Sequence, residues 1–258
     1  NMSRASEVTL AGHVKPSVPS QRYLGLARDW GKAARRPGVA PLGAVLFGLG
    51  DGCQNPDVSV EQGGGADIAL PTRIDAVITD PPYGIGFKYE SHDDNESDWF
   101  VLMDRVVPLM RAAAPFVVMP NCRMQAMKWW MNNHEPDWII AWYKGSPGHL
   151  AKIGFNDWEP HLVWGKPPKQ MHDFFQTPLV IDRYGHPCEK PLAYSTWLVE
   201  RGCVKGGTVC DPFMGSGTTG AAAVKLERKF IGIEIEPKYF DIACERITNA
   251  QRQERLFA

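Results

Sequence analysis

The chain has 258 residues, 44% of them hydrophobic, which is enough to bury one sizeable core and predicts a single folded domain. Its formal net charge of -1 excludes a global positive field that would recruit a nucleic acid, so any such surface must be a local patch. No apolar run approaches the roughly 20 residues that a membrane span needs, so we expect no membrane partner. The six cysteines form no C-x-x-C pair, which predicts reduced thiols in a cytosolic protein and no metal site.

The chain opens with an aperiodic stretch, residues 2–19, and a short helical pattern over Gln21–Arg36. Apolar runs then alternate with helical patterns, which predicts an open α/β sheet of seven mostly parallel strands. The predicted strands are Ala44–Phe47, Ala76–Thr79, Phe116–Met119, Trp138–Trp142, Leu162–Trp164, Thr208–Cys210 and Phe230–Ile235. The predicted helices are Asp98–Ala113, Arg123–Asn132, Leu192–Arg201, Thr218–Leu226 and Pro237–Leu256. We therefore expect an N-terminal arm and helix over residues 1–40 and one domain over 41–258.

The first chemical motif, Asp80-Pro81-Pro82-Tyr83, follows the predicted strand Ala76–Thr79. Ligands of an open parallel sheet bind at the carboxyl ends of its strands, so this turn is placed where a site is expected. Its two prolines lack backbone donors, which leaves the Asp80 carboxylate and the Pro81 carbonyl as acceptors. Acceptors beside the flat ring of Tyr83 suit an amino group on a planar base. A turn that merely ends a strand is the alternative.

The second motif, Asp211-Pro-Phe-Met-Gly-Ser-Gly-Thr-Thr219, joins a predicted strand to a predicted helix. Its glycines allow a ligand close to the backbone, and Gly217–Thr219 exposes helix N-terminal N–H groups to a carboxylate. The next strand ends with Glu234, where a doubly wound fold holds ribose hydroxyls. NAD binding is the usual rival, but the spacing is not G-x-G-x-x-G with an acid about 20 residues later.

In this order the motifs resemble the β-class amino methyltransferases of bacterial DNA. Asp80–Tyr83 precedes Asp211–Thr219 by more than a hundred residues, which is the circularly permuted order of that family. His186-Pro-Cys-Glu-Lys190-Pro is similar to its H-P-x-x-K-P segment, and Phe230–Arg246 resembles its ribose-binding strand and following helix. The resemblance implies a single Rossmann-like methyltransferase domain with a mostly parallel seven-stranded sheet and permuted motifs.

The resemblance also implies a cofactor, S-adenosylmethionine, and the roles of individual residues. The flipped target base is held by Asp80, Pro81, Pro82 and Tyr83. Lys190 lies near the methionine carboxylate, and Asp51, in Gly-Asp-Gly-Cys, contacts the adenine of the cofactor. The full set of implied cofactor residues is Asp51, Asp80, His186, Lys190, Asp211, Phe213, Gly215, Ser216, Gly217, Thr218, Thr219 and Glu234.

The implied reaction is methylation of the N6 amino group of adenine in duplex DNA, because D-P-P-Y accompanies adenine in most members of that family. We expect a catalytic half over about 41–144, a DNA-contact segment over about 145–185 and a cofactor half over about 186–258. A homodimer acting in the bacterial cytoplasm or nucleoid is also expected. The alternatives are cytosine-N4 methylation of DNA, adenine-N6 methylation of RNA and, least favoured, a catalytically inactive nucleic-acid-binding subunit.

Overall fold

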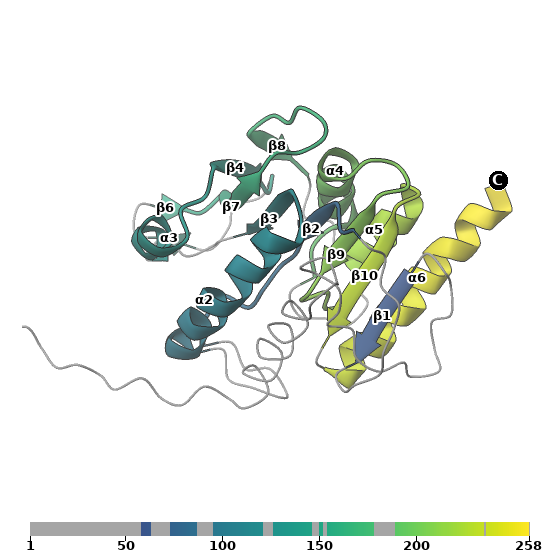
Figure 1. Cartoon of the computed structure of the whole chain (residues 1–258), viewed down its shortest axis with the longest axis horizontal. Helices are drawn as coiled ribbons and strands as arrows, with labels where there is room; N and C mark the ends of the chain where they lie inside the picture. The colour runs from purple at the N-terminus through teal and green to yellow at the C-terminus, as the bar shows by residue number, and fades with distance from the viewer. Residues whose placement is uncertain are drawn as a thin grey trace, which may run out of the picture.

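The computed structural model describes residues 58–62, 73–86, 95–120, 126–145, 150–151, 154–177, 189–234 and 236–257 (Figure 1). Its strands are β1 (Val58–Gln62), β2 (Ala76–Ile78), β3 (Phe116–Pro120), β4 (Trp138–Tyr143), β5 (Leu150–Ala151), β6 (Gly154–Phe155), β7 (Trp158–Gly165), β8 (Phe174–Gln176), β9 (Thr208–Asp211) and β10 (Lys229–Glu234). Its helices are α2 (Glu96–Ala113), α3 (Met127–Asn133), α4 (Leu192–Gly202), α5 (Thr218–Lys225) and α6 (Pro237–Phe257).

The strands form one eight-stranded sheet in the order β1-β10-β9-β2-β3-β7-β4-β8, with β5 and β6 as a separate hairpin. The sheet is parallel except where β7 runs antiparallel to β3 and β4. The expected α/β class with a mostly parallel sheet is therefore confirmed. Six of the predicted strands lie in the described sheet, which also contains two strands that were not predicted, β1 beside β10 and the short β8 beside β4. The expected strand Ala44–Phe47 and helix Gln21–Arg36 lie outside the described residues.

Helices cover both faces of the sheet, and this explains why its central strands are continuous apolar runs. Ala76 and Ile78 of β2 join a buried cluster with residues of α4, α5 and α6. Val77, between them, joins a second cluster with residues of α2 and α3. Successive side chains of a strand point to opposite faces, so β2 contributes to both cores. All five residues of β3 are buried for the same reason.

The chain leaves the centre of the sheet in two directions. From β2 it continues through α2 to β3, and from β9 it continues through α5 to β10 on the other side. The adjacent strands β2 and β9 therefore border a topological switch point, where the carboxyl ends of parallel strands leave a crevice for ligands. Asp80 follows β2 and Asp211 ends β9, so both motifs reach this crevice.

The antiparallel strand β7 begins at the same edge of the sheet. His161 of β7 pairs with Pro120 at the end of β3, which places Glu159, two residues earlier, beyond that edge. The sequence predicted only Leu162–Trp164 of this strand, because a glutamate, a proline and a histidine interrupt its apolar run.

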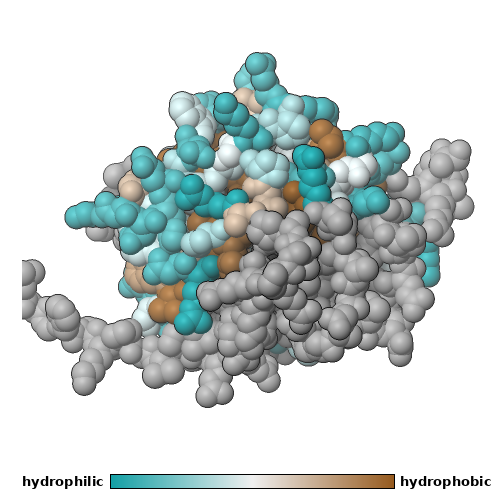
Figure 2. Space-filling view, viewed as in Figure 1, coloured by the Kyte–Doolittle hydropathy of each residue, from teal (hydrophilic) through white to brown (hydrophobic). Residues whose placement is uncertain are grey.

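Hydrophilic side chains cover most of the described surface in Figure 2, with apolar side chains in smaller groups between them. Three exposed aromatic rings, Trp138, Trp158 and Phe174, lie on the strands β4, β7 and β8. Within the described ranges, none of the helices is long and apolar enough to cross a membrane.

Candidate active site

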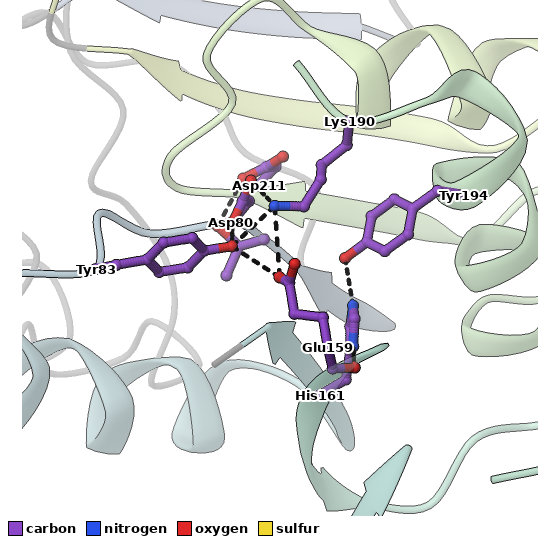
Figure 3. Close-up of polar contacts among 8 residues, drawn as sticks. Asp80, Tyr83, Glu159, His161, Lys190, Tyr194 and Asp211 are labelled. Carbon is purple, nitrogen blue, oxygen red and sulfur yellow. Dashed lines mark hydrogen bonds and ion pairs between the residues drawn. The ribbon is translucent and has the colours of Figure 1, made fainter. Parts of the chain in front are cut away.

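The end of β2 carries a side-chain cluster centred on the Asp80 carboxylate (Figure 3). Tyr83 Oη donates a hydrogen bond of 2.6 Å to Asp80 Oδ1. Lys190 Nζ donates to Asp80 Oδ2 at 2.9 Å and to Tyr83 Oη at 2.8 Å. The side chains of Asp80 and Lys190 keep 29% and 14% of their exposure, so this ion pair is partly shielded from water. The structure thus brings together the D-P-P-Y turn and the lysine of the H-P-x-x-K-P segment.

Glu159 is a fourth member of this cluster. Its Oε1 accepts a hydrogen bond of 3.0 Å from Tyr83 Oη and lies 3.6 Å from Lys190 Nζ. Burial alone would raise the pKa of Glu159, but Lys190, His161 and the Tyr83 hydrogen bond together hold it below its ordinary value. The carboxylate therefore remains charged at neutral pH, and two carboxylates share one lysine.

A buried pair, His161 and Tyr194, backs this cluster. His161 Nδ1 lies 3.1 Å from the Glu159 carbonyl oxygen and Nε2 lies 2.7 Å from Tyr194 Oη. A carbonyl only accepts, so Nδ1 carries the proton and Nε2 accepts from the tyrosine hydroxyl. Burial lowers the pKa of His161 to about 4, and the imidazole is neutral at physiological pH.

The backbone of the D-P-P-Y turn is fixed by α2. The Nε1–H of Trp99 donates a 2.7 Å hydrogen bond to the Pro82 carbonyl. Asn95 caps the same helix by accepting from the Asp98 backbone N–H at 2.9 Å. Since the Pro82 carbonyl already has a donor, the Pro81 carbonyl is the better acceptor for a ligand at this turn.

Asp211, at the end of β9, lies directly beside the D-P-P-Y turn, Asp80–Tyr83, which we call the catalytic turn. Its Oδ1 accepts 2.6 Å from Thr79 Oγ1, which joins the ends of the two strands, and 3.1 Å from the Phe213 backbone N–H. Burial raises the pKa of Asp211 to about 7, because the hydrogen bonds compensate only part of the lost hydration. A cationic group brought to this position would favour the ionised carboxylate.

The glycine-rich turn after Asp211 is held by Glu234. One carboxylate oxygen accepts from the Gly215 backbone N–H at 2.9 Å, and the other from the Glu236 N–H at 2.8 Å. Gly217 takes a left-handed φ of 76°, where an added Cβ would lie 2.9 Å from the Ala243 Cα. Only glycine fits at this helix start.

The first turn of α5 has no side-chain cap, since Gly217 has no side chain to provide one. Because α5 follows the carboxyl end of β9, this uncapped N-terminus begins on the edge of the sheet that carries the switch point, and it suits an anion. The hydroxyls of this turn are fixed from α6 instead, where Arg246 Nη1 donates to Ser216 Oγ at 3.2 Å and Thr218 Oγ1 at 2.7 Å.

These groups fit the chemistry of S-adenosylmethionine. The uncapped N–H groups of α5 suit its carboxylate, and the buried carboxylates Asp211 and Glu234 suit its ammonium and ribose hydroxyls. Phe213, Gly215, Ser216, Gly217, Thr218 and Thr219 all belong to this turn. Two expected cofactor residues, Asp51 and His186, lie outside the described residues.

Sequence reasoning missed Glu159, His161, Tyr194 and Arg246. A signal for the first two exists in the sequence, because a glutamate and a histidine in Trp158–Gly165 interrupt an otherwise apolar strand. Buried polar side chains require partners, and partners inside a sheet near a ligand crevice indicate a functional cluster. Tyr194 and Arg246 sit in amphipathic helices and give no comparable signal.

The described cysteines are buried and chemically unsuited to attack. Burial raises the pKa of the Cys203 thiol to about 12 and that of Cys210 further still, so both remain protonated. Cys244 is also buried. Among the residues that the structure describes, no group of His, Cys, Asp and Glu side chains could hold a metal ion.

Comparison with known proteins identifies the family. A family model described as DNA methylase matches residues 154–245, which include Glu159, Lys190 and the whole glycine-rich turn. The DNA adenine methyltransferase YhdJ of Escherichia coli K12 is 40% identical over 224 residues, covering 67% of this chain and 76% of the relative. The chain belongs to the N6/N4 family of DNA methyltransferases. It is an S-adenosylmethionine-dependent DNA methyltransferase.

Solved structures agree with this assignment. The M1.HpyAVI–SAM complex is 28% identical to this DNA methyltransferase, with a TM-score of 0.52, and covers 68% of this chain and 89% of that one. The cytosine-N4-specific PvuII DNA methyltransferase is 17% identical, with a TM-score of 0.54, and covers 76% and 92%. The latter likeness shows the fold alone.

Proposed function

We propose that this DNA methyltransferase acts on the N6 amino group of adenine. The observation that carries the proposal is the Asp80 carboxylate beside two prolines, at the switch point and next to the glycine-rich turn. The 40% identity to a relative named DNA adenine methyltransferase supports adenine over cytosine.

The amine is activated by hydrogen-bond acceptors. The lone pair of an exocyclic adenine amine is delocalised into the ring, which makes the nitrogen a poor nucleophile. We assign one N–H to Asp80 and the other to the Pro81 carbonyl, because Trp99 already donates to the Pro82 carbonyl. These two hydrogen bonds favour a more tetrahedral nitrogen with a localised lone pair. The reaction needs no covalent enzyme intermediate, in keeping with the protonated thiols of Cys203 and Cys210 among the described residues.

The cofactor supplies a methyl group that is already electrophilic, so the protein mainly has to orient it. We assign the methionine carboxylate to the N–H groups of Thr218 and Thr219, its ammonium to Asp211 and the ribose to Glu234. Lys190 borders both subsites because it lies against Asp80. Phe213, Gly215, Ser216 and Gly217 line the same turn, and by family resemblance Asp51 and His186 complete the pocket.

The target base must leave the duplex to reach this turn, and we propose that it stacks on Tyr83. Stacking would offset part of the few kcal/mol that unpairing and unstacking cost. We also propose that the enzyme is a homodimer in the bacterial cytoplasm or nucleoid, where light scattering on the purified protein tests the dimer.

We propose a narrower DNA-contact region within the expected segment 145–185, on the basis of the direction in which each strand runs. Strand β7 ends at Gly165 on the edge opposite Asp80, which carries the exposed Lys166 and Lys169 away from the catalytic turn. Strands β4 and β8 run parallel to each other and antiparallel to β7, so they end on the catalytic edge. We therefore propose that DNA is contacted after Tyr143 and after Gln176.

A methyl-transfer assay tests the proposed function. Tritium from labelled S-adenosylmethionine should appear in adenine of duplex DNA and to a smaller extent in single-stranded DNA or RNA. Asp80→Ala should lose about 10²–10³-fold in rate, the usual effect of removing one preorganised group. Asp104→Ala, which removes an exposed α2 carboxylate, is the matched control and should behave as wild type. Label in cytosine or preferential labelling of RNA would contradict the proposal.

A further inference from the structure

The Asp80 carboxylate is engaged at both oxygens in this structure. Oδ1 accepts from the Tyr83 hydroxyl, and Oδ2 from the Lys190 ammonium. A carboxylate neutralised by an adjacent ammonium is a weaker acceptor for a third, uncharged donor, since its charge is already compensated. To activate an amine, Asp80 must therefore be relieved of part of this interaction.

Glu159 is placed to receive the same two donors. Its Oε1 lies 3.0 Å from Tyr83 Oη, against 2.6 Å for Asp80, and 3.6 Å from Lys190 Nζ, against 2.9 Å. A movement of Nζ by under about 1 Å would convert the longer contact with Glu159 into a hydrogen bond. Lysine can make this movement because its four-carbon stem is flexible.

Glu159 is itself fixed. Its backbone pairs with Trp142 of β4, two residues beyond the last pair that β7 makes with β3. Its carbonyl accepts from the neutral imidazole of His161, and that imidazole is held by Tyr194 from α4. These contacts hold the backbone of Glu159 in place, so its carboxylate stays within reach of Lys190 and Tyr83.

We propose that Glu159 is a positioning residue that takes over Lys190 and the Tyr83 hydroxyl when Asp80 turns to the target amine. In the free enzyme Asp80 holds both donors. When the amine arrives, the two donors move to Glu159. The charge of the Asp80 carboxylate is then less compensated by the ammonium, which makes Asp80 a stronger acceptor for the amine. This inference rests on the proposed function, because it assumes that Asp80 binds the target amine.

Glu159→Gln removes the charge while keeping the size of the side chain. Lys190 then stays with Asp80, so the single-turnover methylation rate should fall at least about tenfold, within the roughly 100-fold that a misplacement of 1 Å can cost. S-adenosylmethionine affinity and the melting temperature should stay close to wild type. Glu200→Gln, on the exposed side of α4, is the matched control and should change neither rate nor affinity.

The Lys190→Met background separates positioning from a general structural role. Without the lysine only the uncharged Tyr83 hydroxyl is left for Glu159 to take from Asp80. Most of the effect should therefore vanish, and Glu159→Gln should slow Lys190→Met less than twofold. The double variant removes the buried Glu159 carboxylate together with its lysine. Melting temperatures of Lys190→Met and of the double variant show that both are folded before their rates are compared. A further loss of tenfold or more in this background would overturn the proposal.

Asp80→Ala, assayed in parallel, distinguishes the two ways of failing. If Asp80→Ala is inactive and Glu159→Gln is as fast as wild type, the positioning role is wrong and the proposed function stands. If Asp80→Ala keeps the wild-type rate, the proposed function itself is wrong, whatever Glu159 does.

Discussion

The two turns at the switch point differ in how they are held: the catalytic turn, Asp80–Tyr83, and the glycine-rich turn after Asp211, which we call the cofactor turn. In the catalytic turn the polar contacts join side chains from remote parts of the chain, such as Tyr83 with Glu159 and Asp80 with Lys190. In the cofactor turn the acids bind backbone N–H groups, as Glu234 does with Gly215. The polar side chains of the catalytic turn therefore bind mainly one another and can exchange partners, whereas the carboxylate of Glu234 is held by backbone N–H groups of the cofactor turn.

This difference predicts how each turn responds to substitution. Side chains of the catalytic turn are partly exposed, so replacing them should change the reaction more than the stability. Asp211 and Glu234 are buried, and Gly217 sits against the backbone of α6, so changes there should affect cofactor binding and folding together.

The largest effect is expected for Gly215→Asp. The new carboxylate would lie beside Glu234, whose oxygen accepts from the Gly215 N–H. It would also lie where the methionine carboxylate of the cofactor is expected. Like charges at one site repel, so calorimetry should detect no S-adenosylmethionine binding. Gly215→Ala shares the left-handed backbone position, φ 51°, without the charge and should retain more affinity. Wild-type affinity in a folded Gly215→Asp protein would overturn the cofactor assignment.

A smaller effect is expected at Tyr83, where stacking and hydrogen bonding can be separated. Tyr83→Ala should lose roughly 1–3 kcal/mol in transition-state stabilisation, the usual contribution of one base–aromatic stack. Tyr83→Phe keeps the ring and should keep substantial activity. Tyr83→Ala should recover part of its lost rate on DNA with a mismatch opposite the target adenine, because less base pairing must be broken there.

The test is the single-turnover methylation rate of Tyr83→Ala and Tyr83→Phe on matched and on mismatched duplexes. A phenylalanine variant as inactive as the alanine one would mean that the hydroxyl, bonded to Asp80 and Glu159, and not the ring, is what the reaction needs.

In the cofactor turn, Asp211 should make stability depend on pH. Its folded pKa is raised to about 7 from 3.8, mainly by burial, so the folded state binds a proton that the unfolded state releases. The stability contributed by the protonated form is complete below about pH 4 and is lost as pH rises through 7. Urea unfolding of wild type and Asp211→Asn between pH 4 and 8 should show the wild type losing stability relative to the variant as pH rises. A constant difference would contradict the raised pKa.

The sequence predicted the strands that carry both motifs, although β2 has only three residues and β9 four, because each is a buried apolar run that ends in an unusual turn. The edge strands β1 and β8 escaped prediction because neither is a continuous apolar run, and β8 buries only one of its three residues and depends on pairing with β4. The pairing of Asp80 with Lys190, 110 residues apart, could not be read from local pattern, since the fold alone brings them together. Glu159 interrupts an apolar strand, which is a local signal, but its contacts with Tyr83 and Lys190 likewise depend on the fold.

The smallest effect is expected behind the catalytic turn, at the buried hydroxyl of Tyr194. Tyr194→Phe keeps the ring in the core but removes the donor to His161 Nε2, leaving a buried acceptor without its partner. Such a loss costs about 1–3 kcal/mol, and we expect the free energy of unfolding in urea to fall by an amount near the lower end. Since His161 is neutral above its pKa of about 4, the loss should be the same from pH 6 to 8. The methylation rate of the folded variant should stay near wild type, because the strand pairing of β7 still fixes Glu159. A variant of unchanged stability but reduced rate would instead make Tyr194 part of the catalytic cluster. The network of interacting side chains at the site would then extend into α4.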